Sequence, residues 1–472
     1  MAAKPLATPM DCQGYQPQAH NDARDRNFVT RSATSISLIT ADAVTCAKLS
    51  IPGNRQAPAA ILVEHAPQSH RVLAAGPLAQ IQSHPATDRA SRIDRPGCIL
   101  MPAIVNAHTH LDLTHIGPRP HDPDAGFVAW VDMVRANRHT EPAQIRDSVA
   151  QGCRLLRKGG VGLVGDIAGA AGGQPSIEPW QALADSGFAG VSYLEFFAIG
   201  TRTGASIACL EELLATIPSF TNGRAKLGLQ PHAPNTVAPV AFEAAARLAG
   251  QHGIPLITHL AESAEERRFI AECAGPQLEL IQKLGIWSDA SAADFGKGLS
   301  PIEHLEPFIR QSGSSAVHVN QCSDEDLAIL AEARTKVVYC PRASAYFGAD
   351  RHFGPHRYRD MLAAGIEVAL GTDSIINLPS GILDEAGLGL GTLDEARFLH
   401  ARDGTDPDTL VRMITTHGSR VLGFDDALVT LAEGSTPIGI LAIPVPGEGS
   451  PAERVMASKS APELLFDRNH SG

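Results

Sequence analysis

The sequence GCILMPAIVNAHTHLDLTHIG at residues 97–117 joins an apolar run to two histidines that are two residues apart. Successive side chains of an extended strand alternate between its faces, so His108 and His110 should project to the same side. Two imidazoles at the end of one buried strand can bind the same metal ion. A His-x-His motif alone is more often two core histidines or a surface pair, so the interpretation depends on the rest of the chain.

The composition describes a globular protein with a large core, because 44% of its 472 residues are hydrophobic and 19% are charged. The net charge of −12 and the lack of a basic stripe argue against a nucleic-acid-binding protein. Eight scattered cysteines without a C-x-x-C pair favour free thiols in a reducing compartment. We find neither a signal-peptide pattern nor an apolar run of membrane-spanning length, and we expect a cytoplasmic protein.

Short apolar runs near both ends of the chain predict a small β-sandwich domain. They lie within residues 34–102 and, after the long middle part, at residues 438–445. Proline- and glycine-containing stretches separate the runs, as is typical of short strands. We therefore assign residues 34–102 and 423–472 to this domain. Residues 1–33 are polar and without periodicity, and we expect an irregular N-terminal lead-in.

The middle part, residues 103–422, alternates strand-like and helix-like segments. After the first apolar run, seven more follow at residues 160–168, 189–197, 226–234, 254–262, 315–320, 336–344 and 366–374. Continuous apolar runs that alternate with helices indicate an α/β fold with a parallel sheet. Eight such units predict a (β/α)₈ TIM barrel.

Active sites of these barrels lie where the strands end, and polar side chains follow several of the predicted strands. We predict four of them as ligands of one divalent metal ion: His108, His110, His259 and Asp373. Imidazole ligands suit zinc, iron and copper, and a catalytic site needs an open coordination position for water. The competing interpretation is a barrel mouth with polar residues and no metal.

Three further residues at strand ends are predicted to act on the substrate. Glu262 follows His259 by three residues and is expected to carry protons between water and substrate. His318 is expected to polarise the bond under attack or to stabilise the developing oxyanion. His232, between two prolines, is assigned to substrate binding. Asp373 is expected to share proton removal from the metal-activated water with Glu262.

Several segments together resemble the amidohydrolase superfamily, and within it the branch of cytosine-deaminase-like and chlorohydrolase-like enzymes. Besides the first His-x-His run, they are PHAPNT, ITHLAES, VHVNQCSDEDLAIL, VVYCPRASAYFG and VALGTDS, and the likeness spans residues 96–422. The resemblance implies one metal ion, usually zinc and sometimes iron, on His108, His110, His259 and Asp373. It also implies that Glu262 and His318 are the catalytic partners.

A finer likeness is to aminofutalosine deaminases of the alternative menaquinone pathway. It depends on GFVAWVDMVRANR at residues 126–138 and on YCPRASAYFG at residues 339–348. We assign Trp130 and Arg342, from these two segments, to substrate binding, although a tryptophan on a helix is more often a core residue. The relatives carry a small polar residue and a histidine after the arginine, where this chain has Ala343-Ser344. This departure leaves the substrate open.

These observations predict a metal-dependent deaminase that releases ammonia from an aminated purine-like nucleoside or heterocycle. Candidate substrates are aminodeoxyfutalosine, adenosine-type nucleosides including S-adenosylhomocysteine, and guanine. We expect a small-molecule substrate, no nucleic acid and no membrane as partners, and a homodimer stays an open alternative to the monomer.

Other hydrolases and a protein without catalytic activity remain as alternatives. A binuclear hydrolase needs a carboxylated lysine near the end of the fourth strand, where this chain has Gln230-Pro231-His232. Cytidine-type zinc deaminases use H-x-E with P-C-x-x-C, and neither motif is present. A chlorohydrolase or an imidazolone hydrolase on the same scaffold, or a non-catalytic barrel, stays open.

Overall fold

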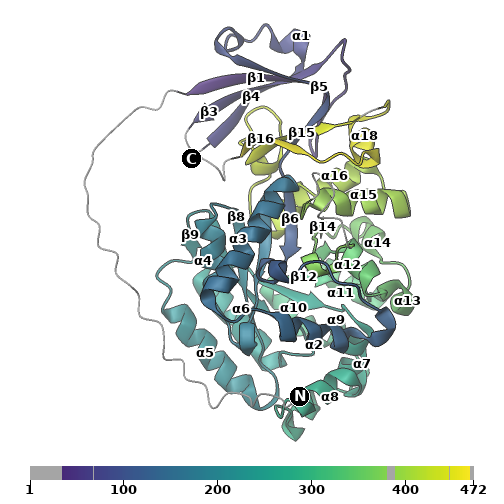
Figure 1. Ribbon diagram of the computed structural model, residues 1–472. Coiled ribbons are helices and arrows are strands. Elements are labelled where there is room, and N and C mark those ends of the chain that lie inside the picture. Colours follow the sequence, from purple (N-terminus) through teal and green to yellow (C-terminus); the bar gives the residue numbers. More distant parts are fainter. Residues whose placement is uncertain (1–33, 67–68, 380–388, 446, 468–472) are drawn as a thin grey trace, which may run out of the picture.

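The computed structural model describes residues 34–66, 69–379, 389–445 and 447–467. The predicted lead-in at residues 1–33 lies outside this part of the chain. Within the described ranges, no helix is both long and apolar enough to span a bilayer. The fold is mixed α/β. Figure 1 shows a larger part, in which helices surround parallel strands, and a separate sheet above it.

Eight parallel strands in two sheets form the centre of the larger part. The first sheet has the order β6-β7-β8-β10-β9 and the second the order β11-β12-β13-β14. Each of the eight predicted apolar runs contains one parallel strand, and β9 is a short antiparallel addition at the edge. Their bounds are β6 Ile104–Thr109, β7 Val161–Ala168, β8 Ala189–Phe196, β9 Thr221–Asn222, β10 Ala225–Pro231, β11 Ile257–Leu260, β12 Ser315–His318, β13 Lys336–Tyr339 and β14 Val368–Leu370.

The two sheets meet at two seams, and each seam holds one isolated parallel bridge. Leu229 pairs with Leu256 at one seam, and Thr109 pairs with Asp373 at the other. The ladders do not continue across these seams, so the predicted barrel is not present as one closed hydrogen-bonded sheet. At the second seam, β14 is only three residues long, and Asp373 after it has a left-handed backbone with φ of 56°.

Helices connect the strands and cover them. Several begin with proline in the first turn, where a missing N–H costs nothing. In α3, Ile145, Val149, Cys153 and Leu156 are buried at helical spacing. The helices of this part are α2 Phe127–Asn137, α3 Pro142–Lys158, α4 Glu178–Asp185, α5 Thr203–Ala215, α6 Pro239–His252, α7 Ala264–Glu272, α8 Pro276–Lys283, α9 Pro301–His304, α10 Glu306–Ser312, α11 Asp324–Glu332, α12 Pro341–Tyr346, α13 Ala349–Phe353, α14 Tyr358–Ala363, α15 Thr392–Asp403, α16 Pro407–Met413 and α17 Thr416–Val421. Two short 3₁₀ helices, η2 Leu111–Ile116 and η7 Ile375–Asn377, follow β6 and β14.

Strands from both ends of the chain join one seven-stranded sheet, in the order β16-β15-β5-β1-β3-β4 with β2 paired to β1. The two-sheet sandwich predicted from the sequence is therefore not confirmed, although the pairing of both chain ends is observed. The bounds are β1 Ser35–Cys46, β2 Leu49–Ile51, β3 Ala59–Ala66, β4 Ser69–Pro77, β5 Ser91–Pro102, β15 Gly439–Pro444 and β16 Glu463–Asp467, with helices α1 Leu78–Ile81 and α18 Pro451–Ala457. The apolar run at residues 97–109 is divided: β5 ends at Pro102 in this sheet, and β6 begins at Ile104 in the parallel sheet.

Candidate active site

The four predicted metal ligands converge from both parallel sheets. His108 lies in β6 with His110 directly after it, His259 lies in β11, and Asp373 follows β14. Nε2 of His108 is 3.4 Å from Nε2 of His259 and 3.7 Å from Oδ1 of Asp373. Nε2 of His110 is 3.5 Å from the same carboxylate oxygen. The structure therefore brings together side chains that are up to 265 residues apart in the sequence (373 − 108).

This arrangement fits a divalent metal ion. Burial lowers the pKa of His108 to about 3, and burial also lowers the pKa values of His110 and His259 well below the ordinary value. The imidazoles are thus neutral at pH 7 and offer lone pairs to a metal. Zn–N bonds of about 2.0–2.1 Å place neighbouring ligand atoms roughly 3–3.6 Å apart. The distances between the ligand atoms agree with this spacing.

Asp373 is fixed so that only one of its carboxylate oxygens faces the histidines. Nδ2 of Asn377, in η7, donates a hydrogen bond of 2.6 Å to Oδ2. The backbone N–H of Asp373 donates to the carbonyl of His108 at 3.0 Å, and the N–H of His110 donates to the carbonyl of Asp373 at 3.2 Å. Burial raises the pKa of Asp373 to about 6. The seam between β6 and β14 is therefore also the support of the candidate metal site.

Glu262 and His318 lie beside this group. Oε1 of Glu262 is 3.5 Å from Nε2 of His318, and ligand atoms of Glu262, His318 and Asp373 all lie within 4.8 Å of one another. Burial, and next the carboxylate of Asp373, raises the pKa of Glu262 well above its ordinary value. A carboxyl group with a raised pKa can hold a proton near neutral pH and release it to a reacting group.

The segment that carries Glu262 is held by two residues that sequence reasoning missed. The buried carboxylate of Glu266 accepts hydrogen bonds from the N–H groups of Ala261, at 2.9 Å, and Glu262, at 2.7 Å. Nδ2 of Asn320 donates to the carbonyl of Glu262 at 2.9 Å. Ala261 and His318 have φ values of 53° and 74°, in the left-handed region that non-glycine residues rarely adopt. Backbone strain of this kind often gathers at functional sites.

The three predicted substrate-binding residues lie in different surroundings. The ring of His232 is 5.0 Å from that of His259. Trp130 packs against Phe347 at 5.2 Å, and Phe347 lines a small pocket together with Glu262. Nε of Arg342 donates to Glu395 in α15 at 2.5 Å, while its Nη2 is buried without a hydrogen-bond partner among the described residues. Among the contacts of the described residues, His232 is the one of these three that reaches a metal-site histidine, His259.

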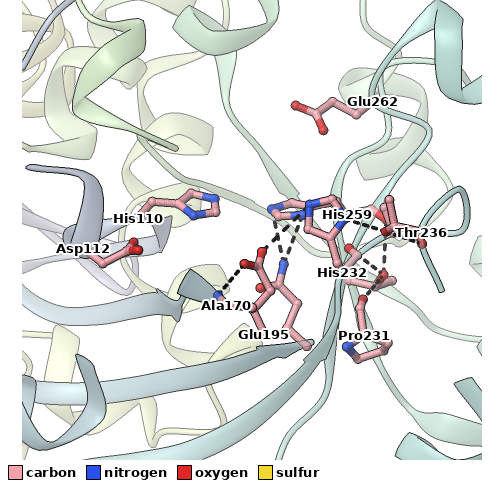
Figure 2. Close-up of polar contacts among 12 residues, drawn as sticks. His110, Asp112, Ala170, Glu195, Pro231, His232, Thr236, His259 and Glu262 are labelled. Carbon is pink, nitrogen blue, oxygen red and sulfur yellow. Dashed lines mark hydrogen bonds and ion pairs between the residues drawn. The ribbon is translucent and has the colours of Figure 1, made fainter. Parts of the chain in front are cut away.

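A buried charged group lies on another side of the histidines, and sequence reasoning missed it as well. Nε of Arg138 donates to Asp112 at 2.8 Å, and Nη1 of Arg138 is 3.7 Å from Oε2 of Glu195. Figure 2 shows Glu195 and Glu262 on opposite sides of the His259 ring. Glu195 interrupts the apolar run AGVSYLEFF near the end of β8. That interruption was a signal in the sequence, because charged residues are rarely buried without a partner.

Comparison with known proteins gives agreeing results. The sequence pattern described as the Amidohydrolase family matches residues 99–437. An aminodeoxyfutalosine deaminase from Deinococcus radiodurans is 27% identical over 346 residues, which cover 70% of this chain and 75% of the relative. A 5-methylthioadenosine/S-adenosylhomocysteine deaminase from Symbiobacterium thermophilum is 25% identical over 379 residues, with coverage of 78% and 77%. The crystal structure of an adenosine deaminase from Xanthomonas campestris with bound zinc has a TM-score of 0.64 at 19% identity and covers 92% of this chain and 89% of its own, which indicates a shared fold.

Proposed function

Because the chain belongs to the amidohydrolase family and is thus a hydrolytic enzyme, we propose that it is a metal-dependent deaminase of an aminated purine-like nucleoside. An aminodeoxyfutalosine-type nucleoside is the first candidate substrate, as in the relative from Deinococcus radiodurans. One observation carries the proposal. Four ligand-type side chains converge at the ends of β6, β11 and β14, with Glu262 and His318 next to them.

The proposal includes the barrel and domain boundaries expected from the sequence. The two parallel sheets would act as one eight-stranded barrel over residues 103–422, with the two bridges as its seams. The zinc-bound adenosine deaminase structure, which shares the fold, supports this arrangement. Residues 34–102 and 423–472 would form an accessory domain around the seven-stranded sheet.

One divalent ion would be held by His108, His110, His259 and Asp373, with Zn²⁺ as the first choice and Fe²⁺ as the alternative. When bound, such an ion supplies Lewis acidity and lowers the pKa of a coordinated water to about 7. The neutral imidazoles and the carboxylate of Asp373 fit this role, because metal ligands must be deprotonated.

The chain's own residues would move the protons of the reaction. Glu262 and Asp373 take protons from the attacking water, and Glu262 protonates the ring nitrogen next to the amino-bearing carbon. His318, 3.5 Å from Glu262, stabilises the tetrahedral adduct. Glu262 then receives the second proton of the water by way of Asp373 and delivers it to the departing amino group, so that water and the amine yield a carbonyl and ammonia. Each such proton transfer contributes typically about 10²–10⁴-fold to the rate.

A second candidate substrate class follows from the relative in Symbiobacterium thermophilum, a deaminase of 5-methylthioadenosine and S-adenosylhomocysteine. The alignment with this relative covers more of the chain than the alignment with the Deinococcus relative, 78% against 70%, but its sequence identity is lower, 25% against 27%. Because Ala343-Ser344 departs from the sequence of the aminofutalosine deaminases, the assay also includes substrates of this second class.

The experiment is an ammonia-release assay on purified protein, with metal analysis of the same sample. The panel holds aminodeoxyfutalosine, 5-methylthioadenosine, S-adenosylhomocysteine, adenosine and guanine, with a chlorinated triazine as the probe for a chlorohydrolase. We expect one metal ion per chain and ammonia release from a purine nucleoside. Two ions per chain would favour a binuclear hydrolase. Chloride release without ammonia release, or no turnover by metal-loaded protein, would contradict the proposal.

A further inference from the structure

Glu195 presents a carboxylate oxygen that has no hydrogen-bond donor among the described residues. The residue is only 2% exposed. Its Oε2 accepts a hydrogen bond of 2.9 Å from the N–H of Ala170 and lies 3.7 Å from Arg138. Its Oε1 lies 3.8 Å from Nε2 of His232, which is too far for a hydrogen bond. Since no described donor reaches this oxygen in an otherwise buried residue, a donor from water or from a ligand should occupy the position next to it.

The carboxylate of Glu195 belongs to a buried group of charged side chains with Arg138 and Asp112. Arg138 is shared by Glu195 and Asp112, and one oxygen of Asp112, Oδ1, is buried without a hydrogen-bond partner in the described chain. Gly169 makes room for this group. A Cβ at residue 169 would lie 1.7 Å from Nη2 of Arg138 and 2.7 Å from Oδ2 of Asp112. The guanidinium thus occupies the space that any other residue at this position would fill.

The group of Arg138, Asp112 and Glu195 lies beside His259, on the side of that ring opposite Glu262 (Figure 2). The ring of His232 lies 5.0 Å from that of His259, and Figure 2 shows Glu262 across His259 from Glu195. A substrate that reacts at Glu262 and His318 therefore needs a different donor for Glu195. In an aminated purine nucleoside, the unsubstituted ring nitrogens are acceptors. In adenosine and 5-methylthioadenosine, the remaining donors besides the reacting amino group are the hydroxyls of the sugar.

We propose that Glu195 is a specificity-determining residue that accepts a hydrogen bond from a sugar hydroxyl of the substrate, with Arg138 and Asp112 holding it in place. This inference rests on the proposed function, because it takes the substrate to be a nucleoside. The alternative occupant is a second divalent ion on Glu195, His232 and His259, whose ligand atoms lie within 4.8 Å of one another. The guanidinium of Arg138, 3.7 Å from the same carboxylate, favours a neutral donor over a cation.

The test compares wild-type protein with Glu195→Gln on matched substrates: the ribonucleoside that the wild type turns over, and its 2′-deoxy and 3′-deoxy analogues. On the ribonucleoside we expect kcat/KM to fall about 10- to 100-fold, as for one hydrogen bond to a charged group, mainly through KM. On the analogue that lacks the contacted hydroxyl, the variant should lose far less. Equal loss on all three substrates, or two metal ions per wild-type chain, would overturn the inference. Glu211→Gln, at an exposed carboxylate that pairs with Arg247 on the surface, is the matched control.

A binding experiment separates this inference from the proposed function. Purine riboside has no amino group to lose, so calorimetric titration reports its affinity whether or not the protein is a deaminase. We expect Glu195→Gln to weaken binding of purine riboside but not of the matching deoxy analogue. Wild-type protein that releases no ammonia but shows this pattern would refute the deaminase and keep the role of Glu195. Wild-type protein that does not bind purine riboside, or equal weakening of both ligands, would refute the role of Glu195.

Discussion

Oε1 of Glu262 lies 3.5 Å from Nε2 of His318, at the ends of two neighbouring parallel strands. Leu260 of β11 pairs with His318 of β12, so the sheet itself sets this distance. Glu266 and Asn320 hold the backbone of Glu262, and Nε2 of His356 bonds to the carbonyl of His318 at 2.8 Å. The two side chains that are expected to handle the proton and the developing charge are thus supported from both sides.

Glu262→Gln tests the proton-transfer role. The amide has the same shape but cannot exchange a proton, so we expect kcat to fall by about 10²–10⁴-fold. The bound metal should be retained, because Glu262 is not one of the four proposed ligands. Ammonia release and metal content measured on one sample decide the point. Turnover near that of the wild type would show that another group carries the proton.

Asn377→Ala tests the support of Asp373. The variant removes the donor to Oδ2 at 2.6 Å and frees the carboxylate to rotate. Loss of such an outer partner typically weakens metal binding about 10- to 100-fold. Competition with a chelator of known affinity measures the change for Zn²⁺. An unchanged affinity would mean that the backbone bonds of Asp373 to His108 and His110 are sufficient to place it.

Variants of the ion pair of Arg342 with Glu395 test whether Arg342 has a structural role or binds the substrate. Both side chains are buried, with exposures of 9% and 0%. Replacing one partner by Arg342→Ala leaves an uncompensated charge and should lower the free energy of unfolding by about 3–5 kcal/mol. The double variant Arg342→Met with Glu395→Leu should recover most of this loss, as measured by urea unfolding. If the double variant is stable but has a greatly raised KM, the buried Nη2 of Arg342 serves the substrate, as the sequence motif predicts.

The sequence was sufficient to predict the parallel strands and the side chains that converge, for a physical reason. A strand buried on both faces reads as a continuous apolar run, and its end is marked by the first polar residues, as at His259 and Asp373. Some residues around the site were missed because their partners are distant in the sequence, as with Arg342 and Glu395, which are 53 residues apart. Asn377 was missed although it is only four residues from Asp373, because nothing in the local sequence indicates that the turn after β14 directs its amide to that carboxylate.

The division of one apolar run between two sheets was also invisible in the sequence. Residues from Ile99 to Ala107 are apolar except for Pro102 and Asn106. Those in β5, up to Pro102, and those in β6, from Ile104, are all buried. Periodicity does not separate two consecutive buried strands. Here Ala103 connects them, and its N–H donates to Gly439 at 2.8 Å, which ties the connection to β15.

Gly371→Ala tests the close approach of β14 to β6. A Cβ at residue 371 would lie 2.9 Å from both the Cβ and the carbonyl oxygen of His108. We expect a loss of about 1–3 kcal/mol in unfolding free energy and weaker metal binding, because His108 must move. Gly250→Ala in α6 is the matched control, since nothing lies within 4 Å of its added Cβ. The control should gain about 0.5–1 kcal/mol. Equal effects of the two variants on metal affinity would show that this contact does not position His108.

Removal of the metal tests the role of the four proposed ligands as a group. Nε2 of His108 and Nε2 of His259 lie 3.4 Å apart, and the carboxylate of Asp373 lies beside them. A bound ion should therefore stabilise the fold as well as permit turnover. At a free ion concentration of about 100 times Kd, the stabilisation is about 2.7 kcal/mol.

We expect chelation to abolish ammonia release and to lower the melting temperature, and one equivalent of Zn²⁺ to restore both. His110→Ala is the comparison, because it removes one ligand and keeps the other three. Its melting temperature should respond to Zn²⁺ only at much higher concentration than that of the wild type. A wild-type melting temperature that does not depend on Zn²⁺, together with activity that survives chelation, would show that these side chains converge for a reason other than holding a metal.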